Sequence, residues 1–128
     1  MSGKSSASVA ETPVDPAELR AYFRWSFKGE PFPCHMGKKE FVLRLKDLSR
    51  GGACGLVDEP FAVGDYFFIR LADNMVVEAE VRWVKRVMIG VKFNHLLTAR
   101  FVVRLHEKAA EERAKRQRDD LNALLKGR

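Results

Sequence analysis

The residues with the clearest capacity for specific chemistry are a carboxylate, a hydroxyl and a glycine in the run Asp47-x-Ser49-x-x-Gly52. One tight turn can present both side-chain oxygens on the same side, with glycine supplying backbone dihedrals that other residues avoid. Guanine carries two N–H donors on one edge that suit a carboxylate, so the run is suited to a guanine edge. The alternative is a plain Asx or Ser turn. Inside it, Arg50 is a further candidate cation and Gly51 a further candidate contact.

A second candidate group lies upstream, where Arg20 and Arg24 are four residues apart. On a helix or in a turn, this spacing places both guanidinium groups on one side. Arginine binds phosphate oxygens and guanine O6/N7 in bidentate fashion and stacks on bases. The pair is therefore suited to a nucleotide or another phosphate. Two surface arginines without a ligand are the alternative.

These residues are positioned by a chain whose central part has the two-residue period of β-strands. Five or six short strands separated by turn residues indicate an antiparallel barrel or sandwich. Residues 25–27 and 32–36 have weaker strand character, because Gly29, Pro31, Pro33 and Gly37 interrupt them, and predict an edge strand or a broken one. The clearer strands are predicted at residues 41–46, 53–57, 66–71, 75–84 and 89–93.

Residues 96–126 predict one C-terminal helix, because they contain neither Pro nor Gly and place apolar residues on one face in their first half. Residues 96–128 hold nine basic and five acidic residues, which gives +4 of the total charge of +6. Leu121, Leu124 and Leu125 form an apolar patch near the far end. The helix is either solvated or a docking helix for a partner or a dimer mate.

The N-terminal region has a different composition. Residues 1–18 are predicted to form a disordered tail, because the segment is polar and poor in aromatic residues. Asp15-Pro16-Ala17-Glu18 is nevertheless typical of a helix start, and a short helix or turn is predicted from there to about Arg24.

The whole-chain composition limits the remaining possibilities. A chain of 128 residues and 14.6 kDa with 46% hydrophobic residues suits one domain with a real core. Cys34 and Cys54 form no CxxC pair, which argues against a disulfide framework or a structural zinc site. No signal-peptide or membrane-spanning stretch occurs, so we expect a soluble, cytoplasmic protein with no membrane insertion. The net charge of +6 suggests an anionic partner.

Taken together, Arg20-xxx-Arg24 and Asp47-x-Ser49-xx-Gly52, separated by 22 residues at a strand end of a small β domain, resemble the PilZ family. Members of this family bind the bacterial second messenger cyclic di-GMP. The resemblance continues through Val63-Gly64-Asp65 and residues 79–93 and covers roughly residues 19–105. It implies a mainly β fold, a six-stranded antiparallel β-barrel with a C-terminal α-helix.

The resemblance also implies roles for individual residues. Arg20 and Arg24 would hold the phosphates and stack on guanine, Asp47 and Ser49 would read the guanine edge, and Gly52 would permit the turn. Many family members carry one more arginine directly before this pair, where this chain has Leu19.

Alternation along residues 75–84 predicts that Trp83 packs in the core, and the alternative places its ring at the rim of the ligand pocket.

Two functions remain from the sequence. In the first, a cyclic di-GMP receptor signals to an unidentified effector protein in the control of motility or surface behaviour, with no cofactor and no metal. In the second, a PilZ-like adaptor binds no nucleotide and acts through its C-terminal helix.

Five acidic residues in that helix argue against nucleic-acid binding. Because nothing pairs a nucleophile with a base, we do not expect an enzyme. The oligomeric state is left open.

Overall fold

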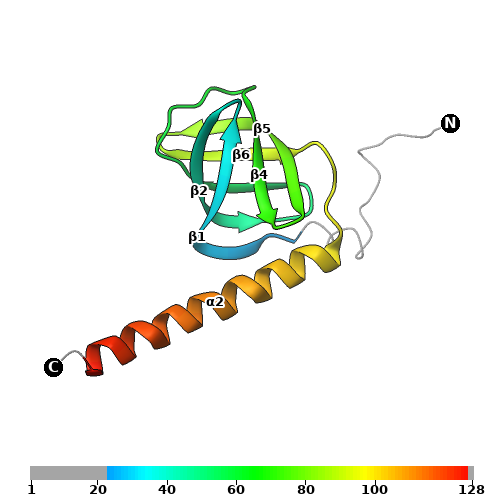
Figure 1. Ribbon diagram of the computed structural model, residues 1–128. Coiled ribbons are helices and arrows are strands. Elements are labelled where there is room, and N and C mark those ends of the chain that lie inside the picture. Colours follow the sequence, from blue (N-terminus) through cyan, green and yellow to red (C-terminus); the bar gives the residue numbers. More distant parts are fainter. Residues whose placement is uncertain (1–22, 127–128) are drawn as a thin grey trace.

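The segments with a two-residue apolar period form strands, and six antiparallel strands close into a barrel (Figure 1). The computed structural model describes residues 23–126. This confirms the predicted six-stranded barrel with a C-terminal helix. In the barrel the neighbours follow the order β1-β2-β3-β6-β5-β4, and the strands are β1 (Trp25–Met36), β2 (Lys39–Leu48), β3 (Gly52–Leu56), β4 (Tyr66–Ala72), β5 (Met75–Lys85) and β6 (Met88–Phe93).

The barrel interior is filled by the apolar residue of each alternating pair. In β4, Phe67 and Ile69 are buried, whereas the intervening Phe68 is 38% exposed. Such burial of apolar surface is the main favourable contribution to folding. The largest fully buried side chains are Phe27, Phe67, Leu43, Leu45, Leu48, Ile69, Ile89, Val81 and Val102.

Strand β1 corrects one expectation. It is a continuous strand of 12 residues with neighbours on both sides, so the prediction of an edge or broken strand is wrong. Gly29 lies in a register shift between Ser26 and Glu30, where Lys28 and Gly29 have positive φ angles of 55° and 81°. Pro31 and Pro33 stay in register with β2, and Gly37 lies in the turn after β1. A bulge of this kind bends a strand without ending it. Glu30, directly after the shift, is buried and pairs with α2.

Helix α2 (Ala99–Lys126) begins three residues later than the sequence pattern suggested, because Thr98 caps it. The Phe101 amide donates to Thr98 Oγ1 at 3.1 Å, which satisfies one of the free N–H groups of the first turn. Val102, Leu105 and Ala109 are the buried residues of the helix. Figure 1 shows α2 passing beside the barrel, with its C-terminal half running beyond the strands.

A buried carboxylate also ties α2 to β1. Glu30 is 7% exposed and accepts two hydrogen bonds from the Arg116 guanidinium, at 3.1 and 2.9 Å. Arg113 Nη1 lies 3.8 Å from the same carboxylate. The Glu30 hydrogen bonds raise the pKa of Arg116 further. The register shift in β1 is therefore linked to the position of the helix.

The predicted tail, residues 1–18, and the helix start at Asp15 lie outside the described residues. Phe23 and Arg24 precede β1 and are not helical. Among the residues that are described, no helix is long and apolar enough to cross a lipid bilayer.

Candidate ligand-binding site

The two candidate motifs meet through an ion pair. Arg24, just before β1, donates from Nε to Asp47 Oδ1 at 2.9 Å, and its Nη2 donates to the same oxygen. Asp47 lies in β2, where Ser26 of β1 is its partner in the register. Both side chains keep contact with solvent, at 51% exposure for Arg24 and 27% for Asp47. The antiparallel pairing of β1 with β2 therefore brings together two motifs that are distant in the sequence.

Two open hollows flank Arg24 on the outer surface of the barrel. The first, of about 410 Å³, lies over the turn between β2 and β3 and the end of β6, and its walls include Ser49, Gly51 and Lys92. The second, of about 300 Å³, lies over the middle of β3, β5 and β6. Asp47, Cys54, Arg82 and Trp83 are among its lining residues. Because Arg24 and Val91 line both, the hollows are adjacent parts of one face.

This face is rich in cationic side chains. Arg24, Arg82 and Lys92 line it, and Asp47 is the carboxylate among the lining residues of the two hollows, with Glu80 as the cross-strand partner of Lys92. Arg82 and Lys92 are exposed. A concave face with a surplus of positive charge attracts anions, and an accessible carboxylate adds selectivity for ligands with N–H donors. The face therefore suits a phosphate-containing ligand that also carries a polar base.

Ser49 stabilises the turn itself. The residue is 4% exposed. Its Oγ accepts a hydrogen bond from the Gly51 amide at 3.3 Å and donates one to the Gly52 carbonyl at 3.4 Å. The Ser49 amide also donates to the Gly52 carbonyl at 2.9 Å. The turn therefore holds the Ser49 hydroxyl inward, in the manner of the Ser turn that the sequence left as an alternative.

Gly52 is required for a reason other than the one that the sequence suggested. Its φ angle is not among the positive ones of the described glycines, so the turn does not depend on an unusual dihedral there. A Cβ atom at this position would lie 2.3 Å from the Val91 carbonyl oxygen of β6. The absence of a side chain allows β3 and β6 to approach at the start of β3, where Gly52 pairs with Lys92.

Arg50 is engaged within the fold. Its Nε donates to the Leu97 carbonyl at 2.6 Å, and its own carbonyl accepts from the Leu97 amide at 2.9 Å. These contacts connect the turn to the segment that leads into α2. The guanidinium of Arg50 is thereby held toward this segment, whereas Gly51 lines the first hollow.

Trp83 is not a core residue, and the prediction from alternation is wrong. A register shift between Val81 and Trp83 adds one residue to β5, which turns Trp83 outward, where it is 43% exposed. Its ring lies over Gly90 so closely that a Cβ there would be 2.0 Å from the indole nitrogen. The indole thus forms a wall of the second hollow, near Arg24.

The sequence reasoning missed Arg82, Lys92 and Cys54. Lys92 occupies an exposed position of β6, and the two-residue period of that strand predicts the exposure. The neighbours of Lys92, however, depend on the pairing of β6 with β3, which is distant in the sequence. Arg20 lies outside the described residues, so its predicted role stays a prediction.

Cys54 gives a local measure of the electrostatics. Cys54 is 8% exposed, and the pKa of its thiol is raised, first by burial and then by the negative charge of Asp47, while Arg24 and Lys46 act in the opposite direction. Burial and Asp47 both favour the protonated thiol. Within residues 23–126 no three His, Cys, Asp or Glu side chains gather in a way that could hold a metal ion.

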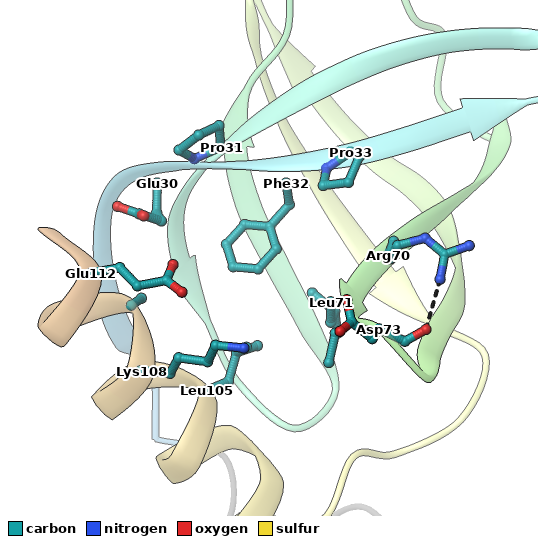
Figure 2. A pocket seen from close by; sticks show the side chains of 12 residues that line it. Glu30, Pro31, Phe32, Pro33, Arg70, Leu71, Asp73, Leu105, Lys108 and Glu112 are labelled. Atoms are coloured by element: carbon teal, nitrogen blue, oxygen red, sulfur yellow. Dashed lines mark hydrogen bonds between the residues drawn. The ribbon is translucent and has the colours of Figure 1, made fainter. Parts of the chain in front are cut away.

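A further hollow of about 220 Å³ lies away from this face, between β1, the turn from β4 to β5 and α2 (Figure 2). Figure 2 shows Phe32 above it, Lys108 and Glu112 on the helix side, and Arg70 donating to the Asp73 carbonyl at 2.9 Å. Neither candidate motif contributes to it. We therefore assign the ligand site to the face around Arg24.

A family model described as the PilZ domain matches residues 18–107. Among the curated proteins, none matches. A similar solved structure is the PilZ domain with c-di-GMP of YcgR from Escherichia coli, 19% identical, with a TM-score of 0.52, covering 73% of this chain and 96% of that one. At this identity the likeness supports the fold.

A crystal structure of YcgR in complex with c-di-GMP from the same organism is also similar, at 21% identity and a TM-score of 0.41. It covers 78% of this chain and 49% of that one.

Proposed function

Since the chain belongs to the PilZ domain family, we propose that it is a receptor for cyclic di-GMP and that the face around Arg24 is the binding site. The observation that carries the proposal is the Arg24–Asp47 ion pair, which joins both motifs between two adjacent hollows. A similar solved domain is described with c-di-GMP, which is consistent with this ligand.

The chemistry of the face fits the parts of this ligand. Arg24 offers a planar guanidinium for a phosphate or for a guanine face, and Asp47 holds it in place through Nε. The Asp47 carboxylate is partly exposed and suits the N–H donors of a guanine edge. Lys92 and Arg82 add positive charge for the dianion, and the Trp83 ring offers a surface for a base. Arg20 would complete the cationic pair.

Ser49 and Gly52 act in this proposal by shaping the turn. The Ser49 hydroxyl keeps the turn closed, and Gly52 lets β3 and β6 approach. Arg50 holds the same turn against the segment before α2. Binding would therefore depend on these residues indirectly, through the position of Asp47 and of the walls of the hollows.

A calorimetric titration of cyclic di-GMP into the full chain tests the proposal. We expect heat of binding for the wild type and a loss in affinity of about tenfold or more for Arg24→Ala and for Asp47→Ala, because each removes a charge-assisted contact. Arg70→Ala is the matched control, since it removes an exposed arginine that lies at the other hollow.

The outcomes separate the ligand from the site. No heat with the wild type at tens of micromolar would exclude the receptor function. Binding that persists in both variants would keep the function but move the site away from Arg24 and Asp47. Arg20→Ala, tested in the same titration, decides whether the first arginine of the pair contributes.

We further propose that bound ligand acts on a partner protein in motility or surface behaviour. A route for the signal exists on the described residues, because Trp25, next to Arg24, packs against His106 of α2 with ring centroids 4.9 Å apart. Phe23 packs against Trp25 at 5.0 Å. We propose that a change at Arg24 reaches α2 through these ring contacts.

The alternative function is an adaptor that binds no nucleotide and acts through α2. The observation in its favour is the exposure of Leu121, Leu124 and Leu125 at 57%, 65% and 67%. A silent calorimetric titration, together with association through the helix, would favour the adaptor over the receptor.

A further inference from the structure

We propose that two copies of this chain associate through antiparallel pairing of the C-terminal parts of their α2 helices. The surface involved is a seam of five residues, and the inference does not depend on cyclic di-GMP. The seam consists of Ala110, Ala114, Gln117, Leu121 and Leu124.

The seam has the spacing of a coiled coil. Its residues follow one another at intervals of four, three, four and three, which is the repeat that keeps one stripe of a helix against a partner. At about 100° per residue, the stripe lies roughly a quarter turn away from the row that packs on the barrel. That row is Val102, Leu105 and Ala109. Gln117, Leu121 and Leu124 of the seam are exposed, and Ala110 and Ala114 are half-buried.

The far end of the seam is uncovered among the described residues. Every residue from 117 to 126 is exposed, and Leu121 and Leu124 are exposed at 57% and 65%. Figure 1 shows this part of α2 running beyond the strands. Exposed leucines at helical spacing on a charged helix indicate a surface that another helix covers.

A second copy of the same helix fits the seam in size. If the copies run antiparallel about a point between Lys115 and Arg116, Leu121 lies opposite Ala110 of the second copy. Ala114 then lies opposite Gln117 of the second copy. Leu121 thus meets a small residue, which favours interdigitation, and Leu124 lies opposite Glu107 of the second copy at the end of the overlap.

Charge fixes the orientation and the register. The residues that flank the seam are Glu111 and Arg118 on one side and Arg113 and Asp120 on the other. In the antiparallel arrangement, Glu111 faces Arg118 of the second copy. Arg113 likewise faces Asp120 of the second copy. Each pair occurs twice because the arrangement is symmetric.

Arg113 lies between the barrel and the seam, and its side chain is 25% exposed. Arg116 donates to both oxygens of Glu30, and Arg113 lies 3.8 Å from that carboxylate, beyond hydrogen-bond distance. Among the described residues, Arg113 Nη1 is buried without a hydrogen-bond partner. Nη1 therefore faces Glu30 of its own chain, and the contact with Asp120 of the second copy falls to the other guanidinium nitrogens.

The competing arrangements place like charges together. A parallel pair sets Arg113 against Arg118 of the second copy. An antiparallel pair shifted by one heptad sets Arg118 against Arg118 and Asp120 against Asp120. A shift by one heptad in the other direction places the Glu111 side chains of the two copies opposite each other. The sequence therefore favours one register and disfavours its neighbours.

Sedimentation equilibrium of the full chain without ligand tests the inference. We expect a mass of twice 14.6 kDa at micromolar concentrations. Arg118→Glu places a second carboxylate opposite Glu111 of the other copy and should weaken the dimer by about tenfold, which is about 1.4 kcal/mol. The double variant Glu111→Arg/Arg118→Glu restores opposite charges and should recover dimerisation.

The same variant distinguishes the orientations. In a parallel pair, Arg118→Glu would face Arg113 and strengthen the dimer, so tighter association would overturn the antiparallel arrangement. Lys115→Glu is the matched control, because Lys115 lies on the side of the helix away from the seam and its reversal should leave the mass unchanged. A wild-type chain that stays monomeric throughout the concentration series would overturn the proposal as a whole.

Discussion

At the scale of single residues, the candidate site depends on where side chains are absent as much as on where charges are present. Gly52 and Gly90 both permit close approach, but to different neighbours. At Gly52 the obstacle to a side chain is the Val91 backbone carbonyl, 2.3 Å away, and at Gly90 it is the Trp83 indole, 2.0 Å away. The Val91 carbonyl can move only if the paired strands move with it, whereas the partly exposed Trp83 indole can rotate by itself.

Alanine at these two positions should therefore have different effects. We expect Gly52→Ala to lower the free energy of unfolding by about 3 kcal/mol, because β3 and β6 must separate. Gly90→Ala should cost about 1 kcal/mol, because the exposed Trp83 ring can rotate away. Chemical denaturation measures both. Gly90→Ala should nevertheless weaken cyclic di-GMP binding, since it rearranges a wall of the second hollow.

Equal stabilities of the two variants would show that the β3–β6 approach at Gly52 is not tight. Trp83→Ala/Gly90→Ala provides the control for the second site. If the Trp83 ring is the obstacle, the double variant should be no less stable than Trp83→Ala alone.

At the scale of elements, α2 has two parts with different tasks. The first part is held on the barrel by buried apolar residues and by the Glu30 carboxylate of β1. The second part is exposed, with its leucines available. Stability and association should therefore be separable along one helix.

Alanine substitutions in the two parts test this division. Leu105 is 8% exposed, so Leu105→Ala should lower the free energy of unfolding by about 2 kcal/mol or more through the cavity it leaves. Leu124 is 65% exposed, so Leu124→Ala should change the stability of dilute protein by less than about 0.5 kcal/mol. Thermal and chemical unfolding at low concentration provide the measurement.

The same pair of variants should behave in the opposite way in sedimentation. Leu124→Ala should weaken self-association, and Leu105→Ala should leave it in place as long as α2 stays folded. A large stability loss for Leu124→Ala in dilute protein would instead place that leucine against its own barrel.

At the scale of the whole molecule, barrel burial also sets how stability depends on pH. Cys34 is 4% exposed, and burial raises the pKa of its thiol from 9.0 to about 12, with a smaller opposing effect of a backbone hydrogen bond. Below pH 9 the thiol is protonated in both the folded and the unfolded chain. Above it, only the unfolded chain releases the proton.

The stability that depends on this thiol is therefore complete below pH 9 and is lost as the pH rises toward about 12. One proton corresponds to about 1.4 kcal/mol for each pH unit in that window. Unfolding by denaturant at several alkaline pH values measures the slope. Cys34→Ala should have a shallower slope than the wild type, and equal slopes would assign the effect to other groups.

The whole chain also shows how much of the fold could be predicted from its sequence. The strands of the barrel were predicted because alternation in segments such as Tyr66–Ala72 reflects one wet and one dry face. The irregular points were not, because the bulge at Lys28 and Gly29 and the extra residue before Trp83 are defined by the pairing of β1 with β2 and of β5 with β6. Local pattern carries no information about closure.

For the site, the chemical groups could be identified from the residue types and their spacing: the arginine pair, the Asp47 carboxylate and the turn that follows it. Which of these groups meet depends on how the strands pair. The pairing of β1 with β2 joins Arg24 to Asp47. The pairing of β3 with β6 brings Lys92 to the site, and the pairing of β5 with β6 brings Trp83. Such long-range pairings are fixed by closing the barrel around one core, and no short stretch of sequence encodes them.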